Sequence, residues 1–191
     1  MLKTYRATDN LLDWNAILPH VTPDTAYVIV TDGAGLQLRD QGGYAAIIYQ
    51  IASRQYGINF GSCAYTTNNR MELQAVLSGV FFMHNIFKAA HGDRALILSD
   101  SEYVVKIALD EWTRKSNGDL WLLFDYWRTR YTLDFRHINR DSIAAPDHIS
   151  KWASRDAREL KRFLLSDSVL QWEQEERDWR SLRDAIQAGS E

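Results

Sequence analysis

The chain has 191 residues, 46% of them hydrophobic and 25% charged, which fits one globular domain with a sizeable core. Its formal net charge of -3 argues against a protein held on nucleic acid by bulk positive charge, so phosphate binding has to come from local basic clusters. The single cysteine, Cys63, excludes an internal disulfide, and no apolar run approaches the length of a membrane span, so we expect a cytoplasmic protein without a membrane partner.

The first part of the chain is predicted to be polar and then rich in strands. Residues 1–25 form an N-terminal extension, in which Asp9-Asn10 can cap a short helix. Strand-like runs of β-branched and aromatic residues follow at 26–31, 43–52 and 58–65. We expect the glycine-rich segment that begins at Asp32 to end the first strand, and the next two strands to pair in antiparallel fashion.

The hydrophobic pattern changes to helical spacing after the third strand. Asn68 or Asn69 is a natural cap for a helix that runs to about residue 90. Pro146 is expected in the first turn of a later helix that runs to about residue 165. Between them the pattern predicts strands at 95–99 and 132–137 and helices at 101–109 and 119–130.

The order of these elements predicts an α/β fold, with a mixed sheet flanked by helices over residues 26–165. Residues 166–191 are expected to form an extra C-terminal helix, because apolar residues from Leu165 to Ile186 recur there at heptad-like spacing. We favour a helix folded back on the domain over one that mediates self-association.

Four acidic residues stand at the ends of these elements. Asp32 and Asp100 directly follow predicted strands, and Glu72 and Asp147 lie in the first turns of predicted helices. Acids placed in this way can converge at one edge of an open α/β sheet. Each position also has an ordinary structural explanation, because helix starts favour carboxylates and strand ends favour turn-forming aspartates. The positions alone therefore leave a shared site unproven.

The residues around these acids carry a resemblance to a known family. Thr66-Thr67-Asn68-Asn69-Arg70-Met71-Glu72-Leu73 resembles the signature octapeptide of bacterial-type ribonuclease HI. Thr31-Asp32-Gly33 and Ser99-Asp100-Ser101-Glu102-Tyr103-Val104 resemble two further segments of that family, in the same order. His137, which precedes Asp147 by ten residues, resembles its mobile histidine. The resemblance covers roughly residues 26–157.

This resemblance implies the ribonuclease H-like fold, with its mixed five-stranded sheet. It also implies an endonuclease that hydrolyses the RNA strand of RNA–DNA hybrids and leaves 3′-hydroxyl and 5′-phosphate ends. The implied cofactor is a pair of Mg2+ ions, with Mn2+ as the alternative, and the implied ligands are Asp32, Glu72, Asp100 and Asp147. His137 would complete the catalytic set by shuttling a proton or helping product leave, because imidazole titrates near neutral pH.

Divalent ions suit the implied reaction. Two hard ions about 3.5–4 Å apart can hold the attacking and leaving oxygens of an in-line displacement at phosphorus, and such ions take oxygen ligands. We expect Asp32 to bridge the ions, Glu72 and Asp100 to complete the one that activates water, and Asp147 to complete the other. Without metal, four close carboxylates repel one another, so the site should be poorly organised and partly protonated.

Substrate-binding residues are predicted around the same acids, at Gly33, Thr66, Thr67, Asn68, Asn69 and Glu102. Telling RNA from DNA requires contacts to the 2′-hydroxyl. The amides of Asn68 and Asn69 can donate and accept hydrogen bonds, and the backbone near Gly33 can approach a minor groove closely. The two threonines are candidates for phosphate binding, whereas Arg70 either binds substrate or braces the loop.

Three departures from the family pattern concern substrate binding. Glu102 stands where the family usually has glutamine, and a carboxylate there would repel phosphate. Residues 112–118 fill the place of a longer basic protrusion and offer only Arg114 and Lys115, so we expect weaker binding to long hybrids. The segment 140–146 lacks the glycine-rich character of the family's loop after its histidine.

Two other functions remain open from the residues alone. A DNA nuclease or integrase-like enzyme on the same fold would also use clustered acids, although the octapeptide argues against it. A hybrid-binding module with weak catalysis is the second alternative. Such modules usually lose an acid, whereas all four candidates are present here.

Overall fold

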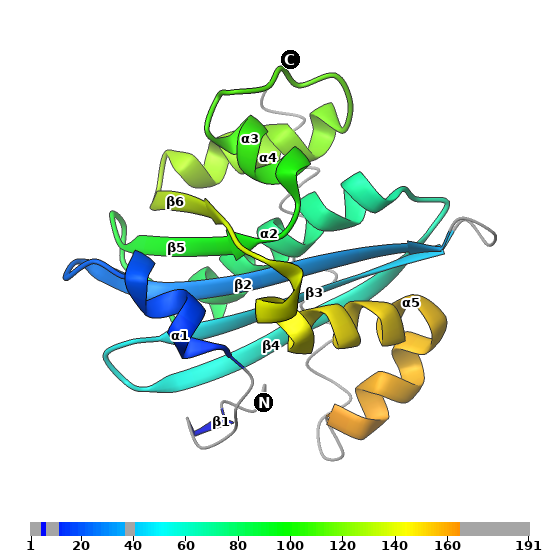
Figure 1. Ribbon diagram of the computed structural model, residues 1–191, viewed down its shortest axis with the longest axis horizontal. Helices are drawn as coiled ribbons and strands as arrows, with labels where there is room; N and C mark the ends of the chain where they lie inside the picture. The colour runs from blue at the N-terminus through cyan, green and yellow to red at the C-terminus, as the bar shows by residue number, and fades with distance from the viewer. Residues whose placement is uncertain (1–4, 7–11, 37–40, 165–191) are drawn as a thin grey trace.

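The computed structural model describes residues 5–6, 12–36 and 41–164, which form a mixed sheet with helices on both faces (Figure 1). The strand order is β1-β4-β3-β2-β5-β6. The strands are β1 Tyr5–Arg6, β2 Thr25–Leu36, β3 Gln41–Gln50, β4 Gln55–Ala64, β5 Arg94–Ser99 and β6 Thr132–His137. Strands β2, β3 and β4 form an antiparallel meander, and β5 and β6 run parallel to β2. The predicted five-stranded sheet is confirmed, and the two-residue strand β1 adds a sixth strand beside β4.

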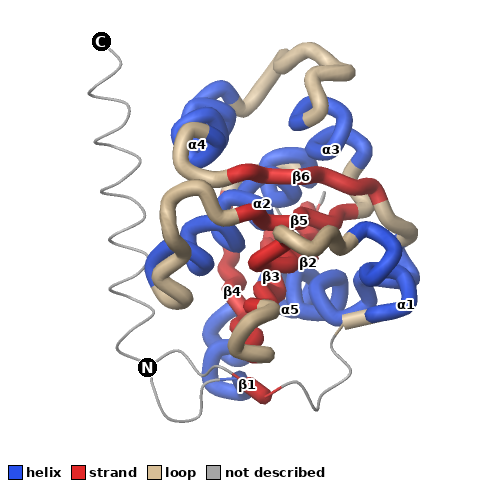
Figure 2. The backbone as a smooth tube through the Cα atoms, turned by 90° about the vertical axis from the view of Figure 1, so that its left-hand side faces the viewer, coloured by secondary structure: helices blue, strands red, loops and turns tan. Residues whose placement is uncertain are grey.

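Helices cover the two faces of this sheet in separate groups. The helices are α1 Trp14–Ile17, α2 Asn68–Asn85, α3 Glu102–Ala108, α4 Gly118–Arg128 and α5 Ala144–Leu164, with single 3-10 turns η1 Leu18–His20 and η2 Arg140–Ile143. Figure 2 shows α1 and α5 on one side of the strands and α2 and α4 on the other. The predicted helix over 166–191, and with it the expectation about self-association, lies outside the described residues.

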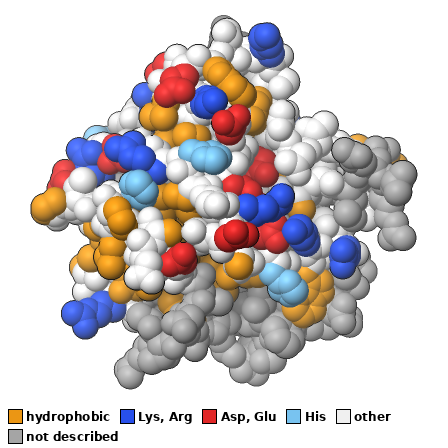
Figure 3. Space-filling model, viewed as in Figure 1, with side chains coloured by type: hydrophobic (Ala, Val, Ile, Leu, Met, Phe, Trp, Pro, Cys, Tyr) orange, Lys and Arg blue, Asp and Glu red, His pale blue; other side chains and the backbone are white. Residues whose placement is uncertain are grey.

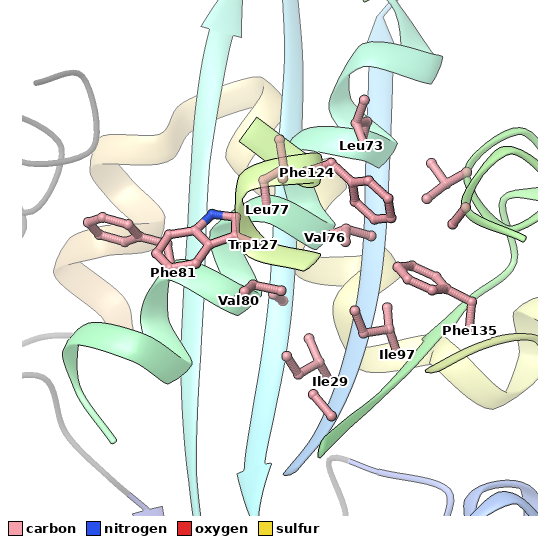
Figure 4. Close-up of a cluster of buried hydrophobic side chains, with 14 of the residues drawn as sticks. Ile29, Leu73, Val76, Leu77, Val80, Phe81, Ile97, Phe124, Trp127 and Phe135 are labelled. Atoms are coloured by element: carbon pink, nitrogen blue, oxygen red, sulfur yellow. The ribbon is translucent and has the colours of Figure 1, made fainter. Parts of the chain in front are cut away.

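Two hydrophobic cores, one on each face, hold these layers together. Successive residues of β2 point to opposite faces, so Ile29 packs with α2 and α4 while Val28 and Val30 pack with α1 and α5. Figure 4 shows the first core, in which Phe124 and Trp127 of α4 lie over the apolar side of α2. Both of these aromatic side chains are fully buried. The two cores fix where α2 and α5 meet the sheet.

Strand β2 is longer than predicted. The glycines after Asp32 were expected to end it, but the strand continues to Leu36 and pairs with β3 from Tyr27 to that residue. The glycines serve close packing instead, because a Cβ atom on Gly33 would lie 2.2 Å from the backbone nitrogen of Glu72. Asp32 therefore lies within a strand and opposite Ala45, which corrects the prediction that it follows the strand.

The start of α2 also differs from the prediction by one residue. Thr67, rather than Asn68 or Asn69, is the N-cap, and its hydroxyl accepts a hydrogen bond from the backbone amide of Arg70. Glu72 consequently lies one turn into the helix, where it is buried, and not in its first turn. Among the described residues, no helix has the length and apolar character needed to cross a membrane.

Candidate active site

Three of the four predicted acids converge beside strand β2. The parallel register of β2 and β5 places Thr31 opposite Ser99, so the following residues, Asp32 and Asp100, lie side by side. Glu72 approaches them from α2, which packs against the strand at Gly33. Carboxylate oxygens of Asp32, Glu72 and Asp100 all lie within 4.8 Å of one another. This grouping of hard oxygen donors suits a divalent cation.

Hydrogen bonds fix the position of Glu72. The backbone amide of Gly33 donates to Oε2 at 3.0 Å, and Nδ2 of Asn68 donates to Oε1 at 3.3 Å. Oδ1 of Asn68 in turn accepts a 3.0 Å hydrogen bond from the amide of Gly35. Gly33 and Asn68 were predicted to contact substrate. In this structure their polar groups orient the carboxylate of Glu72.

Asp32 is fully buried, and its two carboxylate oxygens have different surroundings. The hydroxyl of Ser150, on α5, donates a short hydrogen bond to Oδ2. The other oxygen, Oδ1, is buried and has no hydrogen-bond partner among the described residues. Buried polar atoms are ordinarily satisfied. A buried carboxylate oxygen that accepts no hydrogen bond from the described residues and neighbours two other carboxylates therefore fits the role of a metal ligand.

The electrostatics of this group reflect burial and mutual repulsion. Burial is the main cause that raises the pKa of Asp32 to about 7 and the pKa of Glu72 to about 9, and neighbouring carboxylates add to both effects. Burial also raises the pKa of Asp100. The metal-free site is therefore partly protonated at neutral pH, as expected. Hydrogen bonds from Gly33, Asn68 and Ser150 hold the carboxylates of Glu72 and Asp32 in place.

Asp147, the fourth acid, is held by two cations. It lies in the first turn of α5. Nε of Arg140 lies 3.0 Å from Oδ1, and Nζ of Lys151 lies 2.7 Å from Oδ2. Partial burial raises the pKa of Asp147, but the hydrogen bonds from Lys151 and Arg140 outweigh this effect and lower it overall. Figure 3 shows acidic and basic side chains intermingled near the middle of this face.

The remaining predicted residues surround the acids at different depths. His137, at the end of β6, is exposed, and its Nε2 lies 3.0 Å from the backbone oxygen of Asp100. Thr66 has a buried hydroxyl without a partner among the described residues, and Asn69 is exposed. Glu102 is exposed on α3 and forms an ion pair with Lys106 at 3.2 Å. Glu102 is thus not one of the acids that converge.

Three residues that complete this arrangement were missed by sequence reasoning. Ser150 and Lys151 follow Asp147 at helical spacings of three and four residues, so an i, i+4 ion pair with Lys151 could have been read from the sequence. The contact of Ser150 with Asp32 spans 118 positions and has no local signal. Arg140 was noted only as the first residue of an atypical loop.

Known proteins resemble this chain in sequence. A sequence model of the RNase H family matches residues 24–140, which include Asp32, Glu72 and Asp100. Ribonuclease H of Solibacter usitatus is 30% identical over 149 residues, which cover 70% of this chain and 96% of that protein. Ribonuclease H of a Cyanothece species is 33% identical over 115 residues, covering 53% of this chain and 70% of its own length.

Solved structures share the fold at low sequence identity. The N-terminal RNase H domain of a Mycobacterium tuberculosis protein superposes with a TM-score of 0.61 at 19% identity, over 70% of this chain and 96% of that chain. The ribonuclease H1 named LC11, solved in complex with an RNA/DNA hybrid, has a TM-score of 0.60 at 20% identity, over 69% of this chain and 98% of that chain. With the family match and the Solibacter relative, these findings show that the chain belongs to the RNase H family.

Proposed function

We propose that the chain is a divalent-metal-dependent endonuclease that hydrolyses the RNA strand of RNA–DNA hybrids and leaves 3′-hydroxyl and 5′-phosphate ends. Its catalytic domain would be residues 26–165. The observation that carries the proposal is the grouping of the Asp32, Glu72 and Asp100 carboxylates within 4.8 Å. Membership of the RNase H family and the fold shared with a ribonuclease H1 that was solved with a hybrid support the choice of substrate.

The donor set fits hard cations such as Mg2+ or Mn2+. Asp32, Glu72 and Asp100 would hold one ion, and Asp32 and Asp147 would hold a second. Bound divalent ions supply positive charge that stabilises the attacking and leaving oxygens during displacement at phosphorus. The buried Oδ1 of Asp32 accepts no hydrogen bond from the described residues, so the Asp32 carboxylate would be available to hold a metal ion.

The chain's own residues would orient these ligands and handle protons. Gly33 and Asn68 hold both oxygens of Glu72, and Ser150 holds Oδ2 of Asp32, so the carboxylates need little rearrangement before the reaction. His137 is exposed beside the backbone oxygen of Asp100, so its imidazole can reach solvent and carry a proton to or from the leaving group.

The exposed start of α2 is the proposed contact for the hybrid. Thr67 and Asn69 are exposed there, Thr67 as the N-cap and Asn69 in the first turn of the helix that carries Glu72. Backbone amides at a helix N-terminus favour phosphate, and the Asn69 amide can both donate to and accept from a 2′-hydroxyl. Thr66, Asn68 and Glu102 were also predicted to contact the substrate. Asn68 would have to do so while it keeps its hydrogen bond to Glu72.

The test is a cleavage assay with four substrates: an RNA–DNA hybrid labelled on the RNA strand, the same hybrid labelled on the DNA strand, duplex DNA and duplex RNA. We expect Mg2+-dependent cleavage of the RNA strand of the hybrid, abolished by EDTA and by Asp100→Asn. Asp110→Asn, an exposed acid paired with Arg128 at 3.7 Å, is the matched control and should cleave normally. Cleavage of duplex DNA in preference to the hybrid would support the integrase-like alternative and contradict this proposal.

A further inference from the structure

One basic side chain reaches three of the four acids. Nε and Nη2 of Arg140 lie 3.0 and 2.9 Å from Oδ1 of Asp147. Nε also lies 3.6 Å from Oδ2 of Asp100, and Nη2 lies 4.0 Å from Oδ1 of Asp32. That oxygen of Asp32 is the buried one that has no hydrogen-bond partner in the part of the chain that the structure describes. The guanidinium thus lies between Asp147 and the group formed by the other three acids.

The loop that carries Arg140 is anchored at both ends. Asn139 caps the 3-10 turn η2 by accepting a hydrogen bond from the amide of Asp141, and Ile143 at its other end is fully buried in the second core. The side chain of Arg140 itself remains 58% exposed. Its backbone is therefore held near the acids while its guanidinium is free to turn into solvent.

We propose that Arg140 is a tethered cation that occupies, in the metal-free protein, the place between Asp32 and Asp147 required by a second divalent ion. The inference rests on the proposed function, because it assumes that the four acids bind metal. The second ion then binds only as the guanidinium withdraws from Asp147, whereas a first ion would bind at the group of Asp32, Glu72 and Asp100, where the contacts of Arg140 are longer, at 3.6 and 4.0 Å.

The positive charge of Arg140 explains both its place between the acids without metal and its competition with the second ion. Close carboxylates repel one another, and a cation between them offsets part of that repulsion while no metal is bound. The same positive charge opposes a divalent ion at the same place. Lys151 differs from Arg140, because within the described part of the chain its ion pair is with Asp147, which it approaches at the far oxygen, Oδ2. Arg140 is the cation whose contacts join the two proposed metal positions.

The first test compares Arg140→Gln with wild type and with Arg136→Gln, each freed of metal. Arg136 is a matched control, because it is an exposed arginine on β6 whose Nη1 donates to the backbone oxygen of Phe135. Calorimetric titration with Mn2+ should give two binding steps in the wild type. In Arg140→Gln the second step should be about tenfold tighter, the order expected when one competing cation is removed from a half-exposed site. Arg136→Gln should match the wild type.

The metal-free variant should also be less stable. In EDTA, Arg140→Gln should melt about 2–4 °C below the wild type, which corresponds to the loss of a modest electrostatic contribution in a chain of this size. Saturating Mn2+ should remove that difference. An equal melting temperature in EDTA would contradict the claim that the guanidinium offsets repulsion among the acids.

A second measurement uses the wild-type protein and needs no folded Gln variant. The Nε–H resonance of Arg140, identified by its absence from Arg140→Lys, should change more as the second equivalent of Mg2+ binds than as the first binds. The inference is overturned if this resonance is insensitive to the second equivalent, or if Arg140→Gln binds the second ion no more tightly than Arg136→Gln. Either result leaves the proposed function intact when the wild type binds Mn2+ and cleaves the hybrid. Absence of divalent-ion binding by the wild type overturns both.

Discussion

The backbone amide of Gly33 donates a 3.0 Å hydrogen bond to Oε2 of Glu72, and this contact joins strand β2 to helix α2 inside the candidate site. The two backbones approach so closely that a Cβ atom on Gly33 would lie 2.2 Å from the nitrogen of Glu72 and 2.4 Å from the carbonyl carbon of Met71. The position of a proposed metal ligand thus depends on a residue that has no side chain.

Gly33→Ala should therefore damage both the fold and the site. The added methyl group has to push α2 away from β2, and we expect a loss of about 2–4 kcal/mol in the free energy of unfolding, as for other overpacked or strained core positions. Urea denaturation measures this loss. Gly118→Ala is the control, because a Cβ atom there meets nothing within 4 Å. Equal stability of the two variants would contradict the close approach.

Arg70 is predicted to brace the first turn of α2 against α4. Its Nη1 lies 2.9 Å from Oδ1 of Asp119 and 3.4 Å from Oδ1 of Asn117, and the side chains of Arg70 and Asp119 are 29% and 32% exposed. We expect a double-mutant cycle with Arg70→Gln and Asp119→Asn to give a coupling energy of about 1 kcal/mol.

The matched cycle uses the pair of Arg128 and Asp110, whose atoms are 3.7 Å apart and whose side chains are 43% and 74% exposed. Its coupling energy should be close to zero, because exposed pairs gain little in water. A coupling for Arg70 and Asp119 as small as this one would show that their contact contributes no bracing. Arg70 would then be available to bind the substrate.

How much of the site the sequence could predict depends on how local each signal is. The octapeptide marks Glu72, and the hydrophobic pattern around residues 95–99 marks the strand that ends just before Asp100, so both acids could be identified from short segments. Asp32 was also identified, but its place was wrong, because glycines that usually end a strand here allow α2 to pack on it.

The long-range contacts could not be predicted in this way. Ser150 meets Asp32 only because α5 lies against β3, where a Cβ atom on Gly43 would come 2.2 Å from the backbone oxygen of Ser150. Arg140 reaches the acids because η2 turns the chain back toward them. No periodicity or motif in one sequence records either approach, since both depend on how separate elements pack.

Asp32 should make the metal-free protein less stable as pH rises. Its pKa is raised to about 7 in the folded protein, mainly by burial, from an ordinary value of 3.8. Folding therefore favours the protonated form. The resulting loss in the free energy of unfolding is absent below about pH 4, where Asp32 is protonated in both the folded and the unfolded protein. The loss grows as pH rises and levels off above about pH 7, where Asp32 is ionised in both.

Asp32→Asn should remove this loss. We expect the variant in EDTA to be more stable than the wild type by on the order of 1–3 kcal/mol at pH 8 and close to it at pH 4. An asparagine Oδ1 can still accept from Ser150, so the packing is preserved. Urea denaturation at both pH values measures the difference, and Asp110→Asn controls for loss of a surface charge. A variant that is less stable than the wild type at pH 8 would show that the folded state does not favour protonated Asp32.

The two basic residues of the short 112–118 segment should contribute differently to hybrid binding. Arg114 is engaged within the protein: its Nη2 lies 2.7 Å from Oδ1 of Asp125, and its guanidinium lies 4.9 Å from the ring centre of Trp121. Lys115 is exposed and lines a groove with Asn69 and Trp112, next to the proposed substrate contact. Lys115 is therefore the cation available to phosphate.

Affinity for a hybrid, measured with Asp100→Asn as the inactive background across a range of salt concentrations, separates the two roles. Lys115→Gln should weaken binding and reduce the salt slope by roughly one, as expected for the loss of one phosphate contact. Arg114→Gln should leave the slope unchanged and instead lower the free energy of unfolding by at most about 1 kcal/mol, because its ion pair is partly exposed. A reduced slope for Arg114→Gln would mean that the guanidinium leaves Asp125 to bind phosphate, and that the shortened segment still acts as a basic protrusion.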